Sequence, residues 1–203
     1  MSQPSTDNVV QPESFTFTTE NAKQAAKIIA RYPKGRQASA VIPLLALAQK
    51  QCDNWLPKAA MDVVAGMLGM APIRVYEVAT FYSMYNLAPV GKHLVELCTT
   101  TPCWLRGSNE VVSACEKHLG IKLGETTSDG KFTLKEAECL GACVNAPMAQ
   151  IGDQFFEDLT PQNVVTLLDT LKRGDIPKPG PQSARHSSEP LPGATTLKNR
   201  KTA

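Results

Sequence analysis

Long apolar runs, an excess of charge of either sign and targeting segments are all missing from this 203-residue sequence. Nowhere do about 18 consecutive apolar residues occur, which excludes a bilayer-spanning helix on length grounds. The 21 basic residues nearly balance the 19 acidic ones. The net charge of +2 therefore gives no reason to propose a basic surface that binds nucleic acid or a membrane. We therefore expect no nucleic-acid partner and no direct membrane insertion.

The segment from Met1 to Asp7 lacks both the charged-then-apolar plan of a secretory signal and the Arg-rich, acid-poor plan of a mitochondrial transit peptide. This favours the bacterial cytoplasm over the mitochondrial matrix. Because the cytosol keeps thiols reduced, the six cysteines are expected to be metal ligands or core residues rather than disulfide partners.

Several catalytic and cofactor motifs are also missing. No G-x-G-x-x-G follows an expected strand and no G-x4-G-K-[ST] occurs, so nothing indicates that the chain binds a nucleotide itself. No C-x2-C occurs, which disfavours a dithiol redox site, and no grouping of Ser, His and Asp indicates hydrolysis. The histidines, His93, His118 and His186, show no ligand spacing relative to any cysteine.

The periodicity of apolar residues changes along the chain and divides it into four regions. They are a flexible N-terminal arm over residues 1–18, a helical bundle over 19–88, a strand-and-helix domain over 89–173 and a Pro-rich tail over 174–203. The tail has few large apolar groups and no period, so it cannot bury enough surface to offset the entropy of ordering. We expect an α+β fold with a disordered C-terminal tail.

Four helices are expected in the bundle. Thr19 can cap the first, the second covers about residues 39–52, and Pro57 and Pro72 open the third and fourth, because proline is favoured in a first helical turn.

The order of elements in region 89–173 is strand, helix, strand, strand, strand, helix, which predicts one mixed sheet with helices against it. The expected strands cover residues 93–98, 131–135, 148–151 and 154–156; the expected helices are 108–119, capped by Ser108 or Asn109, and one beginning at Thr160-Pro161.

Four cysteines form two pairs, each directly after an expected strand: Cys98-Thr-Thr-Thr-Pro-Cys103 is C-x4-C and Cys139-Leu-Gly-Ala-Cys143 is C-x3-C. Loops that follow neighbouring strands can converge on one bound group. Four thiolates are the usual ligands of a two-iron, two-sulfur cluster. Our hypothesis is that Cys98 and Cys103 hold one iron and that Cys139 and Cys143 hold the other. Five apolar residues are expected to keep water away: Trp104, Leu105, Leu140, Val144 and Met148.

The spacing alone leaves other readings open. A structural zinc ion also accepts four cysteines from paired loops, and two disulfides are a weaker alternative in a reducing compartment. Cys115 lies on the apolar face of its expected helix and is predicted to pack as a small hydrophobic residue. Cys52 is predicted to do the same.

Three stretches carry a resemblance to a known family: Val75-Tyr-Glu-Val-Ala-Thr-Phe-Tyr-Ser-Met-Tyr85, Cys98-Thr-Thr-Thr-Pro-Cys-Trp-Leu-Arg-Gly107 and Glu138-Cys-Leu-Gly-Ala-Cys-Val-Asn-Ala-Pro-Met148. With Glu157-Asp-Leu-Thr160 they span about residues 20–172. In this order they resemble the thioredoxin-like [2Fe-2S] ferredoxin family, in the form that serves as the two-iron subunit of NADH-quinone oxidoreductase, respiratory complex I.

The resemblance implies a thioredoxin-like cluster domain whose ligands match Cys98, Cys103, Cys139 and Cys143 one for one. It implies that FMN and NADH are bound by the neighbouring subunit, with which the cluster exchanges one electron. No catalytic residue is then expected in this chain. The implied partners are that FMN- and NADH-binding subunit and the adjacent iron–sulfur subunit, which would link the chain peripherally to the inner membrane.

Related subunits serve NAD-dependent formate dehydrogenases and hydrogenases, so the resemblance leaves the parent enzyme open. A second hypothesis is a cluster-containing transcription regulator, because residues 57–84 form two expected helices around a turn. The second of these helices carries only Arg74 as a cation beside Glu77, too little for phosphate contacts. A third hypothesis is a structural adaptor whose metal only folds the C-terminal domain.

Overall fold

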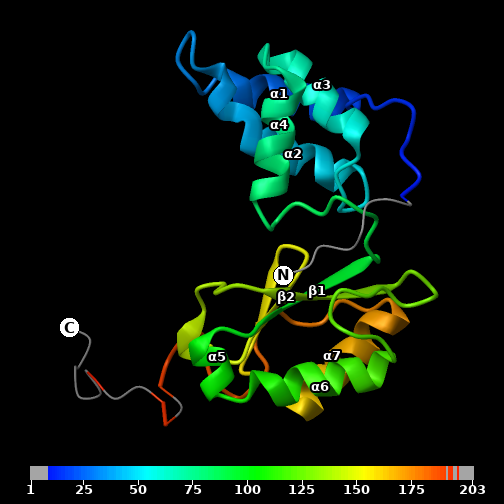
Figure 1. Cartoon of the computed structure of the whole chain (residues 1–203). Coiled ribbons are helices and arrows are strands. Elements are labelled where there is room, and N and C mark those ends of the chain that lie inside the picture. The colour runs from blue at the N-terminus through cyan, green and yellow to red at the C-terminus, as the bar shows by residue number, and fades with distance from the viewer. Residues whose placement is uncertain (1–8, 191, 194–195, 197–203) are drawn as a thin grey trace. The chain divides into compact units, whose positions relative to one another are not determined.

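A computed structural model of the chain describes residues 9–190, 192–193 and 196. The chain divides into two compact units with the boundary between Val90 and Gly91 (Figure 1). The first unit is helical, and the second builds a five-stranded sheet with helices. The α+β class expected from the sequence is confirmed. Within the described residues, no helix has both the length and the apolar character needed to cross a bilayer.

The described part of the N-terminal unit contains four α-helices and one short 3-10 turn. They are α1 (Thr19–Ile29), η1 (Gln37–Ala40), α2 (Val41–Gln51), α3 (Lys58–Leu68) and α4 (Pro72–Phe81). The first helix begins where the sequence predicted, but its cap is Thr18 and not Thr19: the Thr18 hydroxyl accepts the Asn21 amide at 3.2 Å. Pro72 is the first residue of α4, as expected, whereas Pro57 is the N-cap of α3 and stands one residue before its first helical position.

The core of this unit is formed by the apolar stripes of its helices. Leu44 and Leu45 of α2, Val64 of α3 and Val75 of α4 are fully buried. Phe17, which lies in the arm that the sequence predicts to be flexible, also packs against this core. The periodicity of the sequence does not predict this contact, because one aromatic residue makes no stripe.

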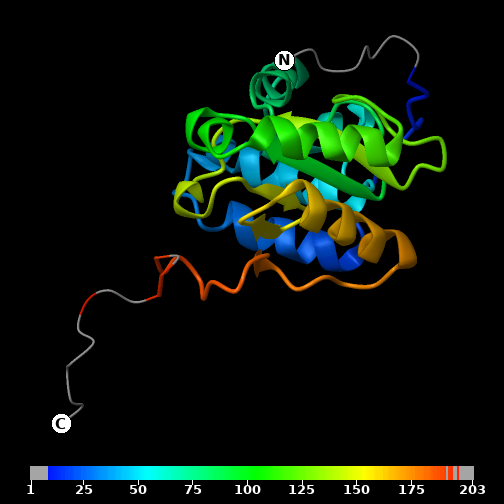
Figure 2. The same ribbon diagram turned by 90° about the horizontal axis from the view of Figure 1, so that it is seen from below.

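The C-terminal unit alternates strands and helices. Its elements are β1 (His93–Cys98), α5 (Thr101–Leu105), α6 (Ser108–Leu119), β2 (Phe132–Ala137), η2 (Cys143–Asn145), β3 (Ala149–Ile151), β4 (Gln154–Glu157), α7 (Pro161–Arg173) and β5 (Gly180–Pro181). The strands follow the order β2-β1-β3-β4-β5, with β1 and β2 parallel and β3 antiparallel to both β1 and β4. Helices α6 and α7 lie side by side (Figures 1 and 2).

The ends of these two helices differ in how well the sequence predicts them. Thr160 and Asn163 form the capping box of α7, as expected from Thr160-Pro161. Helix α6 begins at Ser108 as predicted, but its cap was predicted wrongly: it is Gly107, at φ +94°, and not Ser108 or Asn109. Helix α5 is followed almost directly by α6. The sharp change of direction between them requires a left-handed backbone conformation, which only glycine adopts freely.

Gly91 provides a test of strand packing, because it lies against the backbone of β2. A Cβ atom at Gly91 would come within 2.7 Å of the carbonyl carbon of Phe132 and 2.9 Å of its nitrogen. We expect Gly91→Ala to lower the free energy of unfolding by roughly 1–3 kcal/mol, since backbone cannot move aside cheaply. Urea unfolding measures this loss.

The matched control is Gly66→Ala, in the exposed part of α3. Apart from the neighbouring backbone of its own helix, no described atom lies within 4 Å of a Cβ built there, so the same change should stabilise the chain by roughly 0.5–1 kcal/mol through helix propensity. Equal unfolding midpoints for the two variants would show that the close approach at Gly91 is absent.

Candidate metal centre

The topology of the sheet brings the two cysteine pairs to the same edge. Strands β1 and β2 are parallel neighbours in which Cys98 is opposite Ala137, two residues before Cys139. The carboxyl ends of adjacent parallel strands meet at one edge, where loops carry function. The Thr99 hydroxyl donates to the Glu136 carboxylate at 2.6 Å and so ties the two strand ends together.

Cys98 and Cys103 form the inner pair. Cys98 ends β1 and Cys103 lies in α5, and both side chains are buried, with 2% and 1% exposed. The sequence predicted a loop between them, but the structure has the short helix α5. Pro102 stands in the first turn of this helix, where a missing N–H costs nothing. The helix turns Cys103 back towards Cys98, and each of the two thiols shifts the pKa of the other.

Cys139 and Cys143 form the outer pair. Their Sγ atoms are 3.5 Å apart, and both residues are exposed. The loop between them turns at Gly141, whose φ of +88° is unfavourable for any residue with a side chain. This turn places the Gly141 amide near the Cys139 sulfur.

Each pair combines one thiol of lowered pKa with one of raised pKa. Burial raises the pKa of the Cys98 thiol, but hydrogen bonds from the hydroxyl and amide of Thr100 outweigh it and the pKa falls. Burial, together with the neighbouring Cys98, raises the pKa of Cys103 to about 12.

In the outer pair, the Gly141 amide and the Cys143 thiol lower the pKa of Cys139, while its hydrogen bond with Cys139 raises the pKa of Cys143. In each pair the thiol of lowered pKa is the one that more readily becomes a thiolate, and a neighbouring thiol helps to stabilise that charge. The thiolate is the form of cysteine that binds metal.

The chemistry of these donors fits a binuclear centre. Within the described residues, no three or more His, Cys, Asp or Glu side chains converge as ligands of one metal ion. Instead the four thiols come in two pairs close enough to influence one another's charge. Backbone amides of Leu140, Gly141 and Met148 lie near enough to the sulfurs of Cys98, Cys139 and Cys103, respectively, to favour their charged form. Amides so placed suit a negatively charged iron–sulfur cluster.

The apolar surroundings of the thiols are only partly as expected. Met148 is 2% exposed, and Leu140 packs beside the cysteines. Trp104, Leu105 and Val144 were predicted to keep water away from the cysteines. In the isolated chain this prediction is wrong, since these residues are 56%, 70% and 67% exposed. Helix α5 directs Cys103 inwards, and the next two residues lie about 100° and 200° further around the helix, so they point outwards.

The remaining cysteines and two of the histidines lie outside the site. Cys115 is fully buried in the core of its unit, as predicted, and this burial raises its pKa to about 12. Cys52 is partly buried in the helical unit, also as predicted. His118 pairs with Asp169 at 2.9 Å, and His93 packs on the Phe132 ring.

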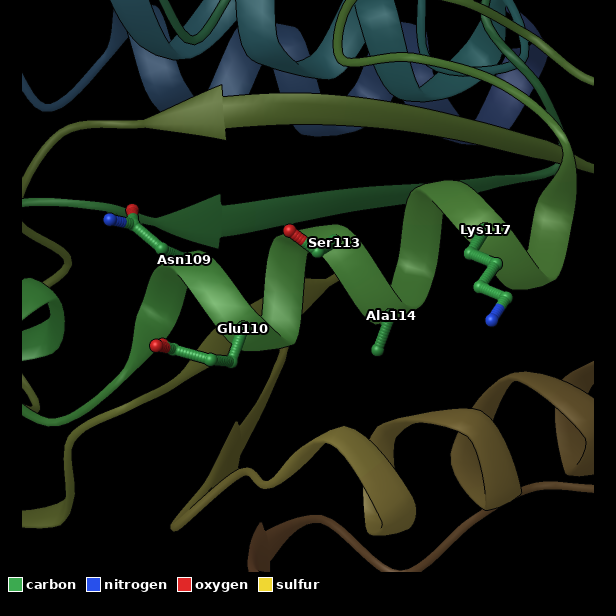
Figure 3. Close-up of a pocket in the computed structure, with 5 residues that line it drawn as sticks. All are labelled: Asn109, Glu110, Ser113, Ala114 and Lys117. Atoms are coloured by element: carbon green, nitrogen blue, oxygen red, sulfur yellow. The ribbon is translucent and has the colours of Figure 1, made fainter.

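A shallow hollow of about 400 Å³ lies on the surface of α6, lined by Asn109, Glu110, Ser113, Ala114 and Lys117 (Figure 3). All five residues come from one helix, and none is a cysteine. The hollow is therefore separate from the paired thiols and brings together no constellation of reactive groups.

Comparison with known families shows to which family the chain belongs. The family model described as thioredoxin-like [2Fe-2S] ferredoxin matches residues 25–172. The chain belongs to this family. The match covers both the helical region and the strands that carry the cysteine pairs, so the resemblance noted in the sequence is confirmed.

Relatives of this thioredoxin-like [2Fe-2S] ferredoxin extend over most of its length. A Dictyostelium discoideum protein named NADH dehydrogenase [ubiquinone] flavoprotein 2, mitochondrial, is 54% identical over 183 residues, covering 90% of this chain and 74% of that protein. A Rickettsia conorii protein, named as a subunit of NADH-quinone oxidoreductase, is 55% identical over 159 residues, covering 78% of this chain and 95% of the relative.

A similar fold is found in the crystal structure of an NAD+-reducing [NiFe]-hydrogenase in the air-oxidized state. The TM-score is 0.56 at 20% identity, and the match covers 66% of this chain and 23% of the hydrogenase chain. At this identity the likeness concerns the fold alone.

Proposed function

We propose that this ferredoxin is an electron-transfer subunit of NADH:quinone oxidoreductase, respiratory complex I, and that it holds one [2Fe-2S] cluster. Cys98 and Cys103 bind one iron, and Cys139 and Cys143 bind the other. The observation that carries the proposal is the meeting of two thiol pairs, with amides near three of their sulfurs, at one edge of the sheet. Relatives at 54% and 55% identity that are named as subunits of this enzyme support the choice of parent complex.

The chain's own residues hold the cluster and control access to it. Bound between the thiolates, a [2Fe-2S] cluster supplies one-electron oxidation and reduction. The inner thiols and Met148 are buried and exclude water, while the outer thiols are exposed. An electron therefore has a short path to a partner that docks over the outer pair.

The partner in this proposal is the FMN- and NADH-binding subunit, with the adjacent iron–sulfur subunit as a second neighbour. The cluster exchanges an electron with the flavin of that partner, and the complex links the chain peripherally to the membrane. The absence of nucleotide-binding motifs from this sequence supports a flavin and an NADH site on another subunit.

Metal analysis tests the cluster itself. The full chain, purified without oxygen, is expected to carry about two iron atoms and two acid-labile sulfides, to absorb visible light that bleaches on reduction with dithionite, and then to give the paramagnetic signal of a two-iron centre. Stoichiometric zinc in a colourless protein would refute the proposal.

Copurification tests the parent enzyme. A tagged chain expressed in its native host should bring down a flavin-containing subunit together with other subunits of NADH:quinone oxidoreductase. Recovery of a formate dehydrogenase or hydrogenase subunit in their place would assign the chain to that enzyme and overturn this part of the proposal.

A further inference from the structure

After α7 the chain adds one more strand to the sheet of the C-terminal unit. This segment is coloured orange to red in Figure 2. Residues Gly180 and Pro181 form β5, which pairs in parallel with β4. The next amide, of Gln182, donates to the Glu157 carbonyl at 2.8 Å. We call residues 180–187 the C-terminal strap. The sequence predicts a tail without regular structure here and does not predict this pairing.

The side chain of Asp158 anchors the C-terminal strap. Its carboxylate accepts the Ser183 hydroxyl at 2.8 Å and lies 3.2 Å from Nε of Arg185. The two charged side chains are only 9% and 6% exposed. Nε of Arg185 has no hydrogen-bond partner among the described residues, so charge attraction joins it to Asp158. Such a pair is strong when it is shielded from water, and a lone partner is costly.

The same arginine reaches the loop that carries the outer thiols. Its guanidinium donates to the Val144 carbonyl at 3.0 Å, one residue after Cys143. The next residue, Asn145, is 2% exposed and donates through its side-chain amide to the Ser187 carbonyl at 2.8 Å. The Asn145 carbonyl accepts the Asp158 amide at 2.7 Å. Two consecutive loop residues are thus held by the strap and by its anchor.

This loop buries little surface of its own. Cys139, Gly141, Cys143 and Val144 are all exposed, so the first half of the loop contributes little to a core. A segment with few buried apolar contacts opens easily unless hydrogen bonds restrain it. The strap supplies those bonds at the end nearest Cys143.

We propose that Arg185 is a positioning residue: the strap fixes the loop through Arg185 and Asn145 and so keeps Cys139 and Cys143 in place for the cluster. The inference rests on the proposed function, because it takes these two cysteines as ligands. It assigns to the segment after α7 the role of retaining the cluster.

The test compares four variants of the full chain: Arg185→Ala, Arg185→Lys, Asp158→Asn and the double variant Arg185→Ala/Asp158→Asn. Asn is chosen because Asp158 has a φ of +51°, which asparagine tolerates. The control is Arg173→Ala, which removes an exposed arginine paired with Asp175. One measurement is the rate at which visible absorbance is lost to an excess of a ferrous chelator without oxygen. The other is hydrogen exchange of the amides of residues 140–146 in metal-free chain.

Arg185→Ala should lose its cluster about tenfold faster than the wild type and exchange the loop amides about tenfold faster, the fold-change expected for one lost charge-assisted hydrogen bond. Arg185→Lys keeps the positive charge, so its rates of cluster loss and of amide exchange should lie between those of the wild type and of Arg185→Ala. The double variant should be no faster than the faster single variant, because the partners act through one contact. Arg173→Ala should match the wild type, and amides in α7 should exchange equally in all variants, since the effect is local.

The possible failures can be told apart. A wild-type chain that holds no cluster would overturn the proposed function and this inference with it. A wild-type chain that holds one, combined with wild-type rates of cluster loss and loop exchange in Arg185→Ala, would overturn the inference alone.

Discussion

Cys139→Ala is expected to reduce the cluster-bound iron of the purified chain by at least about tenfold, because the second iron loses one of its two protein ligands. Cys139 is exposed, so the substitution removes no core contact, and the fold should survive. Iron analysis and the visible spectrum of the anaerobically purified variant measure the loss, while far-ultraviolet circular dichroism checks the fold.

The matched control is Cys115→Ala, the same substitution in the same unit. Cys115 is fully buried and belongs to the core rather than to the thiol pairs. Its removal should lower stability slightly and leave the iron content unchanged. If Cys139→Ala kept a wild-type amount of cluster, Cys139 would not be a ligand and the assignment of the outer pair would be wrong.

The two variants also separate the electron-transfer subunit from a structural adaptor. In an adaptor, losing the metal would unfold the C-terminal unit, and assembly into the complex would fail with it. The buried side chains of this unit, such as Leu134, Val95 and Phe132, form a core without the cysteine pairs. The folded unit is therefore expected to persist without iron.

The elements of the fold that a periodic pattern specifies could be predicted from the sequence. Strand β1 and helix α6 lie where alternation and helical spacing place them. The order of strands and helices was enough to predict a mixed sheet. It was also enough to bring the cysteine pairs near each other, because each pair directly follows a strand.

Other features depend on contacts between distant residues and left no periodic signal. Helix α5 is only five residues long, too short for a stripe, so the sequence predicted a loop. The fastening of the Cys143 loop joins Asn145 to Ser187, residues that are 42 apart in the chain. A lone arginine in a Pro-rich stretch is expected to be a solvated charge, and only the fold shows that the side chain of Arg185 is buried.

The DNA-binding hypothesis finds no support in the described residues. The cation of α4, Arg74, donates to the Glu77 carboxylate at 2.8 Å, so its charge is already compensated on the helix surface. Binding to DNA gains its free energy largely from cations that contact phosphates. Helix α4 offers none beyond this paired residue.

The second large effect is expected in the sheet that supports the site. Leu134 of β2 is fully buried, opposite Val95 of β1. We expect Leu134→Ala to lower the free energy of unfolding of the C-terminal unit by about 2–5 kcal/mol, the sum of lost transfer free energy and an unfilled cavity. A domain of this size is stable by only about 5–15 kcal/mol. Hydrogen exchange of the β1 and β2 amides measures the change unit by unit.

Leu105→Ala makes the same chemical change at a site that is 70% exposed. It should alter the free energy of unfolding by no more than about 0.5 kcal/mol, because the side chain at this position is exposed to water in the folded state as well as in the unfolded state. The comparison isolates burial, since both residues are leucines of one unit. If the two variants lost equal stability, the core would not lie between β2 and its covering helices, and the edge that carries Cys98 and Cys139 would lack the rigid support on which the proposed site depends.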